Sequence, residues 1–341
     1  MPTQVQVGIW NVGCSVGTGP RMQTLMNFTG TLVHQDRFRL LQDVVASALM
    51  LMPPQATTTP SIRIFLAPEY YFAKNETEKA ASYDVKTQVL TSLANLSDQH
   101  RTLILIPGTV AYCKELLTTT KDRRAKYARV MPTNPQNPHP VRVSHNTAYV
   151  FHNGGQVFKY RKATDAHELE DGERDGGRMV YVPGTGPSVF RLLNQTIGIE
   201  ICADHEGGWL SRNRPQSDLD IHVILSASTT FKPNYACVRE GGIVCHADSS
   251  NAPAVYQKVR GVMVPTGPVG ISDIDPALDP QLAPTVEARR KDHTRAVVNS
   301  LIGLPAKSTT GAPVRAPAIR RKEQDYLNAR GGKLGVFQVT I

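Results

Sequence analysis

The sequence lacks several features that would place it in a familiar class of protein. No apolar run reaches the ~18 residues that a membrane-spanning helix needs, which excludes an integral membrane protein. The first residues contain neither a basic segment nor a long apolar one, so we expect no secretory signal. No internal repeat is present, and 40% hydrophobic residues are too many for a disordered chain. The 341 residues suffice for one large domain, or for a domain of about 250 residues with an extension.

Signatures of disulfide, metal and phosphate sites are also missing. The five cysteines form no CxxC pair and leave one over if they pair, which argues against a disulfide scaffold or a zinc ribbon. We therefore expect a reducing compartment, the cytoplasm. The ten histidines contain no HxxxH pair, and the Gly-rich segment 13–19 lacks the Gly-Lys-Ser/Thr of a phosphate loop. The sequence thus predicts neither a metal nor a cofactor.

The net charge of +9 is concentrated in one segment. Residues 286–322 contain nine basic and two acidic side chains, a net charge of +7. Such a segment is able to bind nucleic acid or an acidic membrane surface. Tyr326 is the one aromatic residue near it, so base stacking is poorly supported. We interpret the segment as a solvated or dimer-packing extension and do not expect a nucleic-acid partner.

The first hundred residues alternate between β-rich and helical patterns. Apolar residues at spacings of three and four predict helices over 37–52 and 84–97. Apolar, β-rich runs predict strands at 4–10, 61–67 and 102–107. The resulting β-α-β-α-β order is typical of an α/β layered fold.

The remaining residues predict strands around two long irregular segments. Residues 114–142 are basic, rich in Pro and Asn and aperiodic, so we interpret them as an inserted loop. Residues 276–333 form a basic, Pro/Arg-rich extension with one helical candidate at 286–302. His152-Asn-Gly-Gly predicts a hairpin turn. Strands are expected at 146–151, 156–160, 220–226 and 243–247, with two more in 189–201, a helical segment at 236–241 and a closing strand at 334–341.

Three residues that can carry chemistry follow apolar strands, where ligands bind in α/β sheets. Glu69 stands among apolar and aromatic neighbours, so desolvation would make it a usable proton acceptor and donor. Lys162 closes a strand and can bring positive charge to a developing oxyanion. Cys202 precedes Ala-Asp and then Gly-Gly, so it can be presented on a sharp turn as a nucleophile.

Each of these residues also has a structural interpretation. Considered singly, Glu69 would be interpreted as a solvated carboxylate at a strand end and Cys202 as a buried structural thiol. Lys162 would be one of the basic residues that are common at strand ends. A papain-like pair of Cys202 with His205 or His246 is a rival, but no flanking signature supports it. The other cysteines are interpreted as packing or surface residues: Cys14, Cys113, Cys237 and Cys245.

Five spaced motifs resemble those of the nitrilase, or carbon–nitrogen hydrolase, superfamily in the same order. The resemblance covers roughly residues 4–275, which we interpret as the hydrolase domain (1–275). The motifs are Ala67-Pro-Glu69; Asn146-Thr-Ala with Asn153-Gly-Gly and Lys159-Tyr-Arg-Lys162; Tyr181-Val-Pro-Gly184; Gly198-Ile-Glu-Ile-Cys-Ala-Asp204; and Val238-Arg-Glu-Gly-Gly-Ile-Val244.

The resemblance implies an α-β-β-α sandwich that dimerises through the helices beside the nucleophile. It implies that Glu69 takes the thiol proton of Cys202, while Lys162 and the Ala203 N–H stabilise the tetrahedral anion. A second glutamate eight residues after the lysine corresponds to Glu170. Because the intervening residues depart from the family pattern, Glu168 and Glu173 remain alternatives.

The sequence thus predicts a cysteine-dependent hydrolase of non-peptide C–N bonds, with an amidase as the first choice. A nitrilase, a carbamoylase, an acyltransferase and a non-catalytic scaffold remain alternatives. Ala203 replaces the aromatic residue that follows the nucleophile in the family, and the strand ending at Ser226 lacks the usual Pro-Ser. These departures alter the substrate pocket and remove no catalytic group. We expect the insertion 114–142 to cap the pocket.

Overall fold

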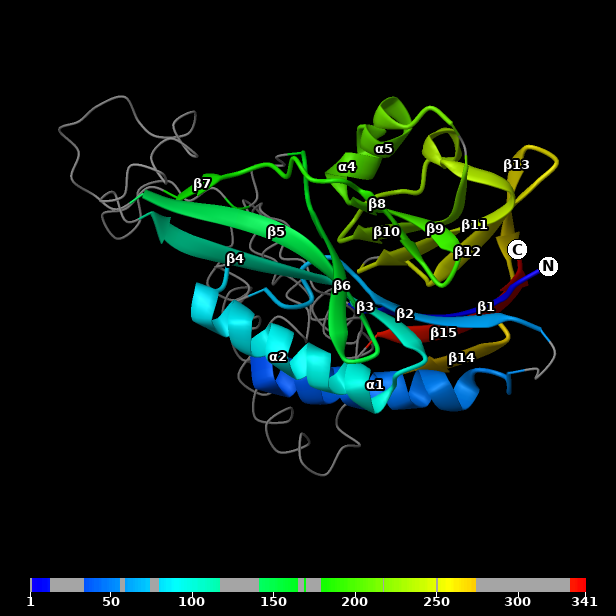
Figure 1. Cartoon of the computed structure of the whole chain (residues 1–341), viewed down its shortest axis with the longest axis horizontal. Coiled ribbons are helices and arrows are strands. Elements are labelled where there is room, and N and C mark those ends of the chain that lie inside the picture. The colour runs from blue at the N-terminus through cyan, green and yellow to red at the C-terminus, as the bar shows by residue number, and fades with distance from the viewer. Residues whose placement is uncertain are drawn as a thin grey trace, which may run out of the picture.

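The computed structural model describes residues 2–12, 34–55, 59–73, 80–116, 141–164, 169, 179–216, 218–249, 251–273 and 332–341. Within these ranges, two long helices and two β-sheets confirm the predicted α/β class (Figure 1). Helix α1 (His34–Leu51) and helix α2 (Tyr83–Gln99) lie close to the ranges predicted for them. Ser82 caps α2 by accepting a hydrogen bond from the Val85 N–H (3.3 Å).

The first sheet has nine strands in the order β14-β15-β1-β2-β3-β5-β4, and β6 and β7 also pair with β5. β1, β2 and β3 run parallel, whereas β15 runs antiparallel to β1, so the last strand of the chain lies beside the first. The strands are β1 (Gln4–Asn11), β2 (Ser61–Ala67), β3 (Leu103–Pro107), β4 (Thr109–Leu116), β5 (Val141–His152), β6 (Gly155–Arg161), β7 (Met179–Tyr181), β14 (Gly270–Asp273) and β15 (Lys333–Thr340).

The second sheet has six strands in the order β13-β12-β11-β10-β9-β8. β9, β10 and β11 are parallel, so their carboxyl ends meet at one edge. The strands are β8 (Val189–Leu192), β9 (Gln195–Ile201), β10 (Leu219–Ser226), β11 (Val238–Asp248), β12 (Ala254–Val259) and β13 (Val262–Thr266). Two short helices, α4 (Ala203–Glu206) and α5 (Trp209–Asn213), follow β9, and a 3-10 turn, η2 (Pro233–Tyr235), precedes β11.

Three apolar cores fix the order of the layers (Figure 1). The first core packs α1 and α2 against one face of the nine-stranded sheet, with Leu41 of α1 and Phe65 of β2 among its members. The second lies between the two sheets, where Ile64 of β2 and Ile199 of β9 belong to one cluster. The third covers the outer face of the six-stranded sheet and includes Leu210 of α5. Alternation along β9 and β10 therefore sends apolar side chains to the inter-sheet core and their neighbours outward.

Most of the predicted strands are present, and the hairpin turn is confirmed. Asn153 (φ 50°) and Gly154 (φ 78°) have the positive φ angles of the two-residue turn that joins β5 to β6. The predicted first, second, third and closing strands correspond to β1, β2, β3 and β15. The helical candidate at 286–302 and the Gly-rich segment 13–19 lie outside the described residues.

The predicted helical segment at 236–241 is wrong. These residues lead into β11, which begins at Val238. Between Leu219 and Ile221 of β10, the paired residue of β11 steps from Val238 to Ile243, so β11 carries a bulge. Gly241 supplies the positive φ (78°) within it. Pairing with β10 therefore prevails over the local helical pattern.

The predicted insertion at 114–142 is too wide at both ends. β4, which the sequence did not predict, runs from Thr109 to Leu116, and β5 begins at Val141. The two strands pair antiparallel along their whole shared length. Residues 117–140 lie outside the described residues.

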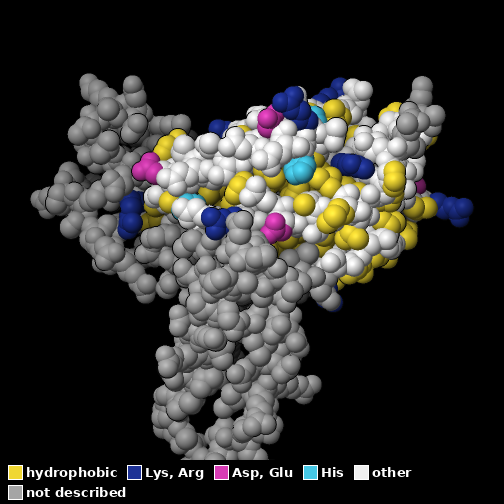
Figure 2. Space-filling model, turned by 90° about the horizontal axis from the view of Figure 1, so that it is seen from below, with side chains coloured by type: hydrophobic (Ala, Val, Ile, Leu, Met, Phe, Trp, Pro, Cys, Tyr) yellow, Lys and Arg dark blue, Asp and Glu magenta, His cyan; other side chains and the backbone are white. Residues whose placement is uncertain are grey.

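Hydrophobic side chains are exposed where α1 ends beside β14. Met50 is 80% exposed and Ile271 is 64% exposed, and Leu51 lies against Gly270. Figure 2, which looks onto the α1–α2 side, shows hydrophobic side chains gathered on this face. Among the residues that the structure describes, no helix has the length and apolar character needed to cross a membrane.

Candidate active site

Glu69 lies two residues beyond the end of β2, in a loop that helix α1 holds in place. Its side chain is fully buried. Arg37 of α1 is also buried and donates from Nη1 to the backbone oxygens of Tyr71 (2.9 Å) and Ala73 (2.7 Å). Tyr71 Oη donates in return to the Arg37 backbone oxygen (2.6 Å). These charge-assisted bonds fix the loop that carries Glu69.

The backbone beside Glu69 has an unusual conformation. Tyr70 has φ 62°, a region that residues with a side chain rarely adopt, and its N–H donates to Thr109 Oγ1 (2.8 Å). A Cβ on Gly108 would lie 2.2 Å from the Pro68 oxygen, so only glycine fits against this turn. A strained residue directly after a buried carboxylate is typical of functional sites.

Lys162 follows the last residue of β6, and its side chain is only 2% exposed. Its Nζ donates to Glu69 Oε1 (2.8 Å), forming a buried ion pair. The Lys162 backbone oxygen accepts hydrogen bonds from Tyr181 Oη (2.6 Å) and the Gly184 N–H (2.9 Å). A Cβ on Gly184 would lie 2.0 Å from the Arg161 oxygen, so glycine is required at that close approach. The Tyr181–Gly184 motif thus positions the lysine.

Cys202 stands between the last residue of β9 and the first residue of α4. Its φ of 48° and ψ of −105° produce a sharp turn from strand to helix. The side chain is 8% exposed, and Sγ lies 3.0 Å from Thr229 Oγ1. Ala203 is the first residue of α4, so the helix's own hydrogen bonds do not use its N–H.

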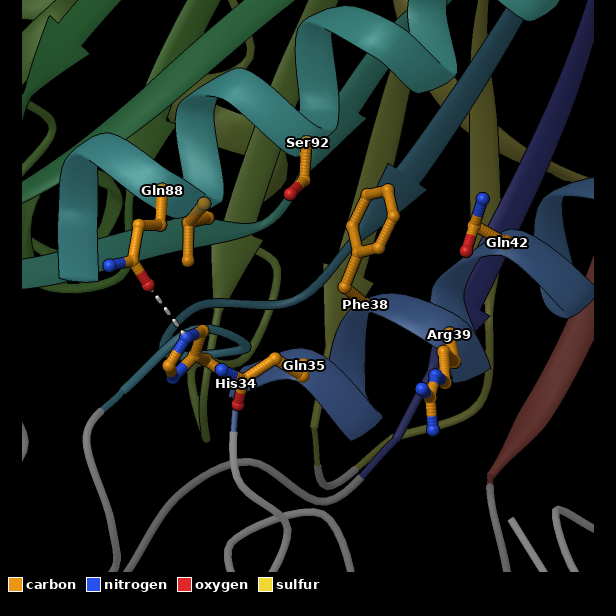
Figure 3. A pocket seen from close by; sticks show the side chains of 8 residues that line it. His34, Gln35, Phe38, Arg39, Gln42, Gln88 and Ser92 are labelled. Atoms are coloured by element: carbon orange, nitrogen blue, oxygen red, sulfur yellow. Dashed lines mark hydrogen bonds between the residues drawn. The ribbon is translucent and has the colours of Figure 1, made fainter. Parts of the chain in front are cut away.

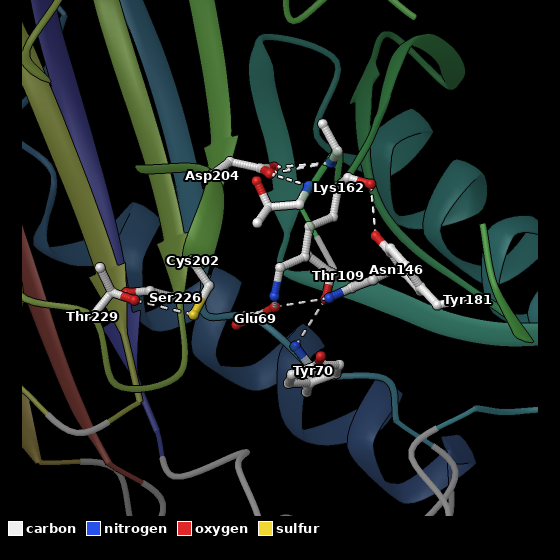
Figure 4. A network of polar contacts seen from close by, with 12 residues as sticks. Glu69, Tyr70, Thr109, Asn146, Lys162, Tyr181, Cys202, Asp204, Ser226 and Thr229 are labelled. Carbon is white, nitrogen blue, oxygen red and sulfur yellow. Dashed lines mark hydrogen bonds and ion pairs between the residues drawn. The ribbon is translucent and has the colours of Figure 1, made fainter. Parts of the chain in front are cut away.

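Backbone contacts with the end of β10 place Cys202 and Glu69 together. The Cys202 N–H donates to the Leu225 oxygen (2.9 Å), and the Glu69 N–H donates to the oxygen of the next residue, Ser226 (3.3 Å). The Cys202–Leu225 bond lies within the six-stranded sheet, whereas the Glu69–Ser226 bond joins the nine-stranded sheet to it. Figure 4 shows Cys202 Sγ, Glu69 and Lys162 converging from their separate strand ends.

Asp204 links the turn after Lys162 to the turn after Cys202. Its carboxylate is fully buried and accepts hydrogen bonds from the Thr164 N–H (2.6 Å), the Ala163 N–H and Tyr160 Oη (2.8 Å). Burial raises the pKa of the Asp204 carboxyl, although the bonds from Thr164 and Tyr160 oppose that shift. The structure therefore brings together the three residues that the sequence selected separately: Glu69, Lys162 and Cys202.

Sequence reasoning assigned no role in this site to two polar residues, although Asn146 belongs to one of the motifs. Asn146 of β5 is fully buried, and its Nδ2 donates to Glu69 Oε1 (2.8 Å), the oxygen that also binds Lys162. Thr229 contacts the Cys202 sulfur. Asn146 carried a signal, because a polar side chain in an apolar strand needs a buried partner. Thr229 carried none, since it stands among other polar residues.

A second buried cluster lies on the outer side of β9 and β10. Glu200, His205 and His222 offer ligand atoms within 4.8 Å of one another, a donor set that suits zinc. His205 Nδ1 lies 2.8 Å and His222 Nε2 lies 3.0 Å from Glu200 Oε2. His205 Nε2 accepts the Lys232 N–H (3.0 Å), so the ring proton is on Nδ1 and faces the carboxylate. A protonated Nδ1 does not bind a metal, and the cluster is a hydrogen-bonded network.

Neither rival histidine is well placed to act as the base. Both ring nitrogens of His205 are engaged, by Glu200 and by Lys232, and His246 Nε2 lies 2.8 Å from Ser226 Oγ. This arrangement favours Glu69 over a Cys–His pair. The packing interpretation of Cys237 and Cys245, both buried free thiols, is confirmed, and Cys113 is a half-buried free thiol.

Several predicted site residues fall outside the described part of the chain. They are Glu170, its alternatives Glu168 and Glu173, and Cys14.

A hollow between α1 and α2 is separate from this site. His34 and Phe38 of α1 and Gln88 of α2 help to line an open groove of about 290 Å³ (Figure 3). His34 Nε2 lies 3.3 Å from Gln88 Oε1. Neither cysteine nor carboxylate is among the described residues that line it, so the groove does not compete as a catalytic site.

Comparison with known proteins gives structural matches only. No protein-family model matches the chain, and no curated protein matches it by sequence. The chain is similar to solved structures of the nitrilase superfamily. An amidase from Nesterenkonia sp. is 13% identical with a TM-score of 0.42, over 78% of this chain and 80% of that one. Saccharomyces cerevisiae Nit3, a member of branch 10 of the superfamily, is 14% identical with a TM-score of 0.41, over 76% and 84%. Identities and TM-scores this low carry no information about the reaction. The chemistry is therefore inferred from the side chains of the site.

Proposed function

We propose that this chain is a cysteine-dependent hydrolase of non-peptide C–N bonds and that its substrates are amides. The observation that carries the proposal is the buried Glu69–Lys162 ion pair, which meets Cys202 on its sharp turn. Removing two charges from water costs free energy, which a close ion pair offsets only in part, so such pairs are often kept for a function. A base, a cation and a thiol brought together from three strand ends suit acyl transfer through a covalent intermediate.

In the proposed first step, Glu69 accepts the proton of the Cys202 thiol. The sulfur then forms a bond to the amide carbonyl carbon, and the carbonyl oxygen becomes an anion. Lys162 Nζ and the Ala203 N–H are the donors that would stabilise that anion. Because Lys162 already donates to Glu69 Oε1 at 2.8 Å, the same cation also holds the carboxylate in position to accept the proton.

In the following steps, Glu69 returns the proton to the leaving nitrogen as the C–N bond breaks. Ammonia or an amine departs and a thioester remains on Cys202. Glu69 then removes a proton from water and the hydroxide attacks the thioester carbon. The C–S bond breaks to release the acid, and Glu69 returns its proton to the Cys202 sulfur. Asn146 Nδ2 orients the carboxylate through all of these steps from its position 2.8 Å from Oε1.

Other features belong to the same proposal. We propose that the layers form the α-β-β-α sandwich of the nitrilase superfamily and that the chain assembles as a homodimer or higher homo-oligomer. The four free thiols among the described residues are what the cytoplasm would maintain. We propose Glu170 as the second glutamate, with Glu168 and Glu173 as alternatives, and we propose that the insertion within 114–142 caps the pocket. No cofactor takes part, so chelators should leave the activity intact.

The test is ammonia release from a panel of aliphatic and aromatic amides, carbamoyl compounds and nitriles. We expect Cys202→Ala to lower the release from the best substrate by at least about 10³-fold. Cys113→Ala is the matched control, because it removes a free thiol of β4 that lies outside the site, and it should keep nearly full activity.

The outcomes separate the alternatives. Release from nitriles alone would favour a nitrilase, and transfer of the acyl group to an added amine would favour an acyltransferase. Equal release from wild type and Cys202→Ala would contradict the proposal. Silence from both proteins with every compound would favour a non-catalytic scaffold.

A further inference from the structure

The segment 226–232, here called the Thr229 loop, is anchored at its start by a buried carboxylate. Asp248 of β11 is fully buried. Its Oδ2 accepts hydrogen bonds from the Thr229 N–H (3.0 Å) and from Ser226 Oγ (2.5 Å). Its Oδ1 accepts from the backbone and the side chain of Asn251 (3.0 and 2.9 Å). One carboxylate therefore fixes the backbone at Thr229 to the end of the neighbouring strand.

The other end of the Thr229 loop is anchored by a second buried carboxylate, through a histidine. The Lys232 N–H donates to His205 Nε2 (3.0 Å), and His205 Nδ1 donates to Glu200 Oε2 (2.8 Å). The His205 ring also stacks on Phe231, with 5.8 Å between centroids. Glu200 precedes Cys202 by two residues, so the strand that ends at the nucleophile also holds the loop facing it.

Thr229 is held between these anchors with its hydroxyl against the nucleophile. Oγ1 lies 3.0 Å from Cys202 Sγ, and the Thr229 side chain is 1% exposed. A β-branched side chain has few rotamers, so a fixed backbone also fixes the hydroxyl. The neighbouring Thr230 is exposed. The two anchors of the loop therefore hold the Thr229 hydroxyl against the Cys202 sulfur.

We propose that Thr229 orients the Cys202 thiol and stabilises its thiolate by donating the hydroxyl hydrogen to Sγ. The inference rests on the proposed function, in which the thiol proton passes to Glu69. In the thiol form, either atom can donate across this contact; once the thiol proton has passed to Glu69, the hydroxyl donates to the sulfur. No bond of Thr229 breaks. When the sulfur is acylated it loses its negative charge, so the hydrogen bond that the Thr229 hydroxyl donates to it weakens.

The test measures thiolate formation directly. The rate of alkylation of Cys202 by iodoacetamide, located by peptide mass spectrometry, is followed from pH 5 to 10 in wild type, Thr229→Val, Thr229→Ala and Thr229→Ser. Thr230→Val is the matched control on the exposed neighbour. All variants keep the charged and titratable groups around the loop and the thiol: Glu69, Lys162, Glu200, Asp204, His205, His246 and Asp248.

Loss of the hydroxyl should raise the midpoint of the alkylation profile by about one pH unit in Thr229→Val and Thr229→Ala. Thr229→Ser, which keeps the hydroxyl, should lie within a few tenths of a unit of wild type, as should Thr230→Val. A Val and Ala profile that overlies wild type would overturn the proposal. An equal shift in the Ser variant would also overturn it, because packing and not the hydroxyl would then be the cause.

Two further measurements, of folding and of ammonia release, complete the test. If Thr229→Val fails to fold by circular dichroism, the Ala and Ser variants still decide between the outcomes. Ammonia release, measured on the same samples, separates the two proposals: a shifted profile without hydrolysis by any variant would contradict the hydrolase and leave the thiolate role of Thr229 standing. A wild-type Cys202 that resists alkylation throughout the range would overturn both.

Discussion

Two buried glutamates flank the Cys202 turn, and their surroundings differ. Glu69 and Glu200 are both fully buried. Glu69 binds a lysine and an amide, Lys162 and Asn146, and faces the sulfur between the two sheets. Glu200 is on β9, and alternation along that strand sends it outward, where it binds two histidines and the Leu210 N–H (2.7 Å). We therefore propose a chemical role for Glu69 and a structural role for Glu200, although both side chains are equally buried.

The titration of Glu200 is consistent with a structural role. Burial raises the pKa of the Glu200 carboxyl, but the hydrogen bonds from His205 and His222 outweigh it and lower the pKa to about 2. A carboxylate that stays ionised at every ordinary pH does not exchange protons in a reaction near neutrality. Glu69 is distinguished by its ion pair with Lys162 and by its position beside the thiol of Cys202.

The largest expected effect comes from Glu69→Gln, which would remove the base and keep the shape. Activity of the folded variant should fall by at least about 10³-fold, in the range measured for loss of a general base. Ammonia release per folded molecule is the measurement, and Glu200→Gln is the matched control at equal burial. Comparable losses of activity in both variants would contradict the claim that the two glutamates have different roles.

Glu200→Gln should act on stability. It removes a buried charge that two histidines and a backbone N–H share, so the free energy of unfolding should fall by about 3 kcal/mol. The folded fraction should keep activity within about tenfold of wild type, because Glu200 points to the outer side of β9, away from Cys202 Sγ. Urea unfolding gives the first number and activity below the transition gives the second. An unchanged unfolding midpoint would refute the structural assignment.

A smaller effect is expected from acid, which should lower the free energy of unfolding in two pH ranges that belong to different residues. Burial lowers the pKa of His205 and lowers that of His246 to about 4, so between pH 6.5 and 4 the folded chain binds fewer protons than the unfolded chain. Stability is therefore highest above pH 6.5 and should fall by about 2 kcal/mol toward pH 4. Glu200, whose pKa is lowered, stabilises the fold above pH 4.5, and that contribution is lost as pH falls toward 2.

Unfolding measured at pH 7.5, 5 and 3.5 tests these two windows. His246→Gln should flatten the upper window, and Glu200→Gln should flatten the lower one. Stability that rises as the pH is lowered from 7.5 to 5 would contradict the assignment.

The sequence was sufficient to predict the positions of residues that directly follow a strand. Glu69 and Cys202 each follow an apolar strand whose parallel neighbours were also visible, so their meeting at the sheet edges could be anticipated. The helix over 236–241 failed because pairing of β11 with β10 and β12 is a long-range contact that a local period does not record.

Other features needed three-dimensional contacts that the sequence does not encode locally. β4 was missed because its run from Thr109 contains Lys114 and Glu115 and lacks clear alternation. Thr229 is distinguished from Thr230 only by which one is buried against Cys202. The two anchors of the Thr229 loop join residues about 20 to 30 positions apart through buried carboxylates, a pattern that hydrogen bonding reveals and composition does not.

The central claim is that Cys202 carries the acyl group of the substrate during turnover. The most direct measurement mixes the protein with the amide that releases ammonia fastest, quenches in acid within one turnover and maps the added mass by peptide mass spectrometry. The account predicts an acyl group on the peptide that contains Cys202, and none on the peptides of Cys113, Cys237 or Cys245. Acylation of another residue, or turnover with no acylated Cys202 at any quench time, would contradict it.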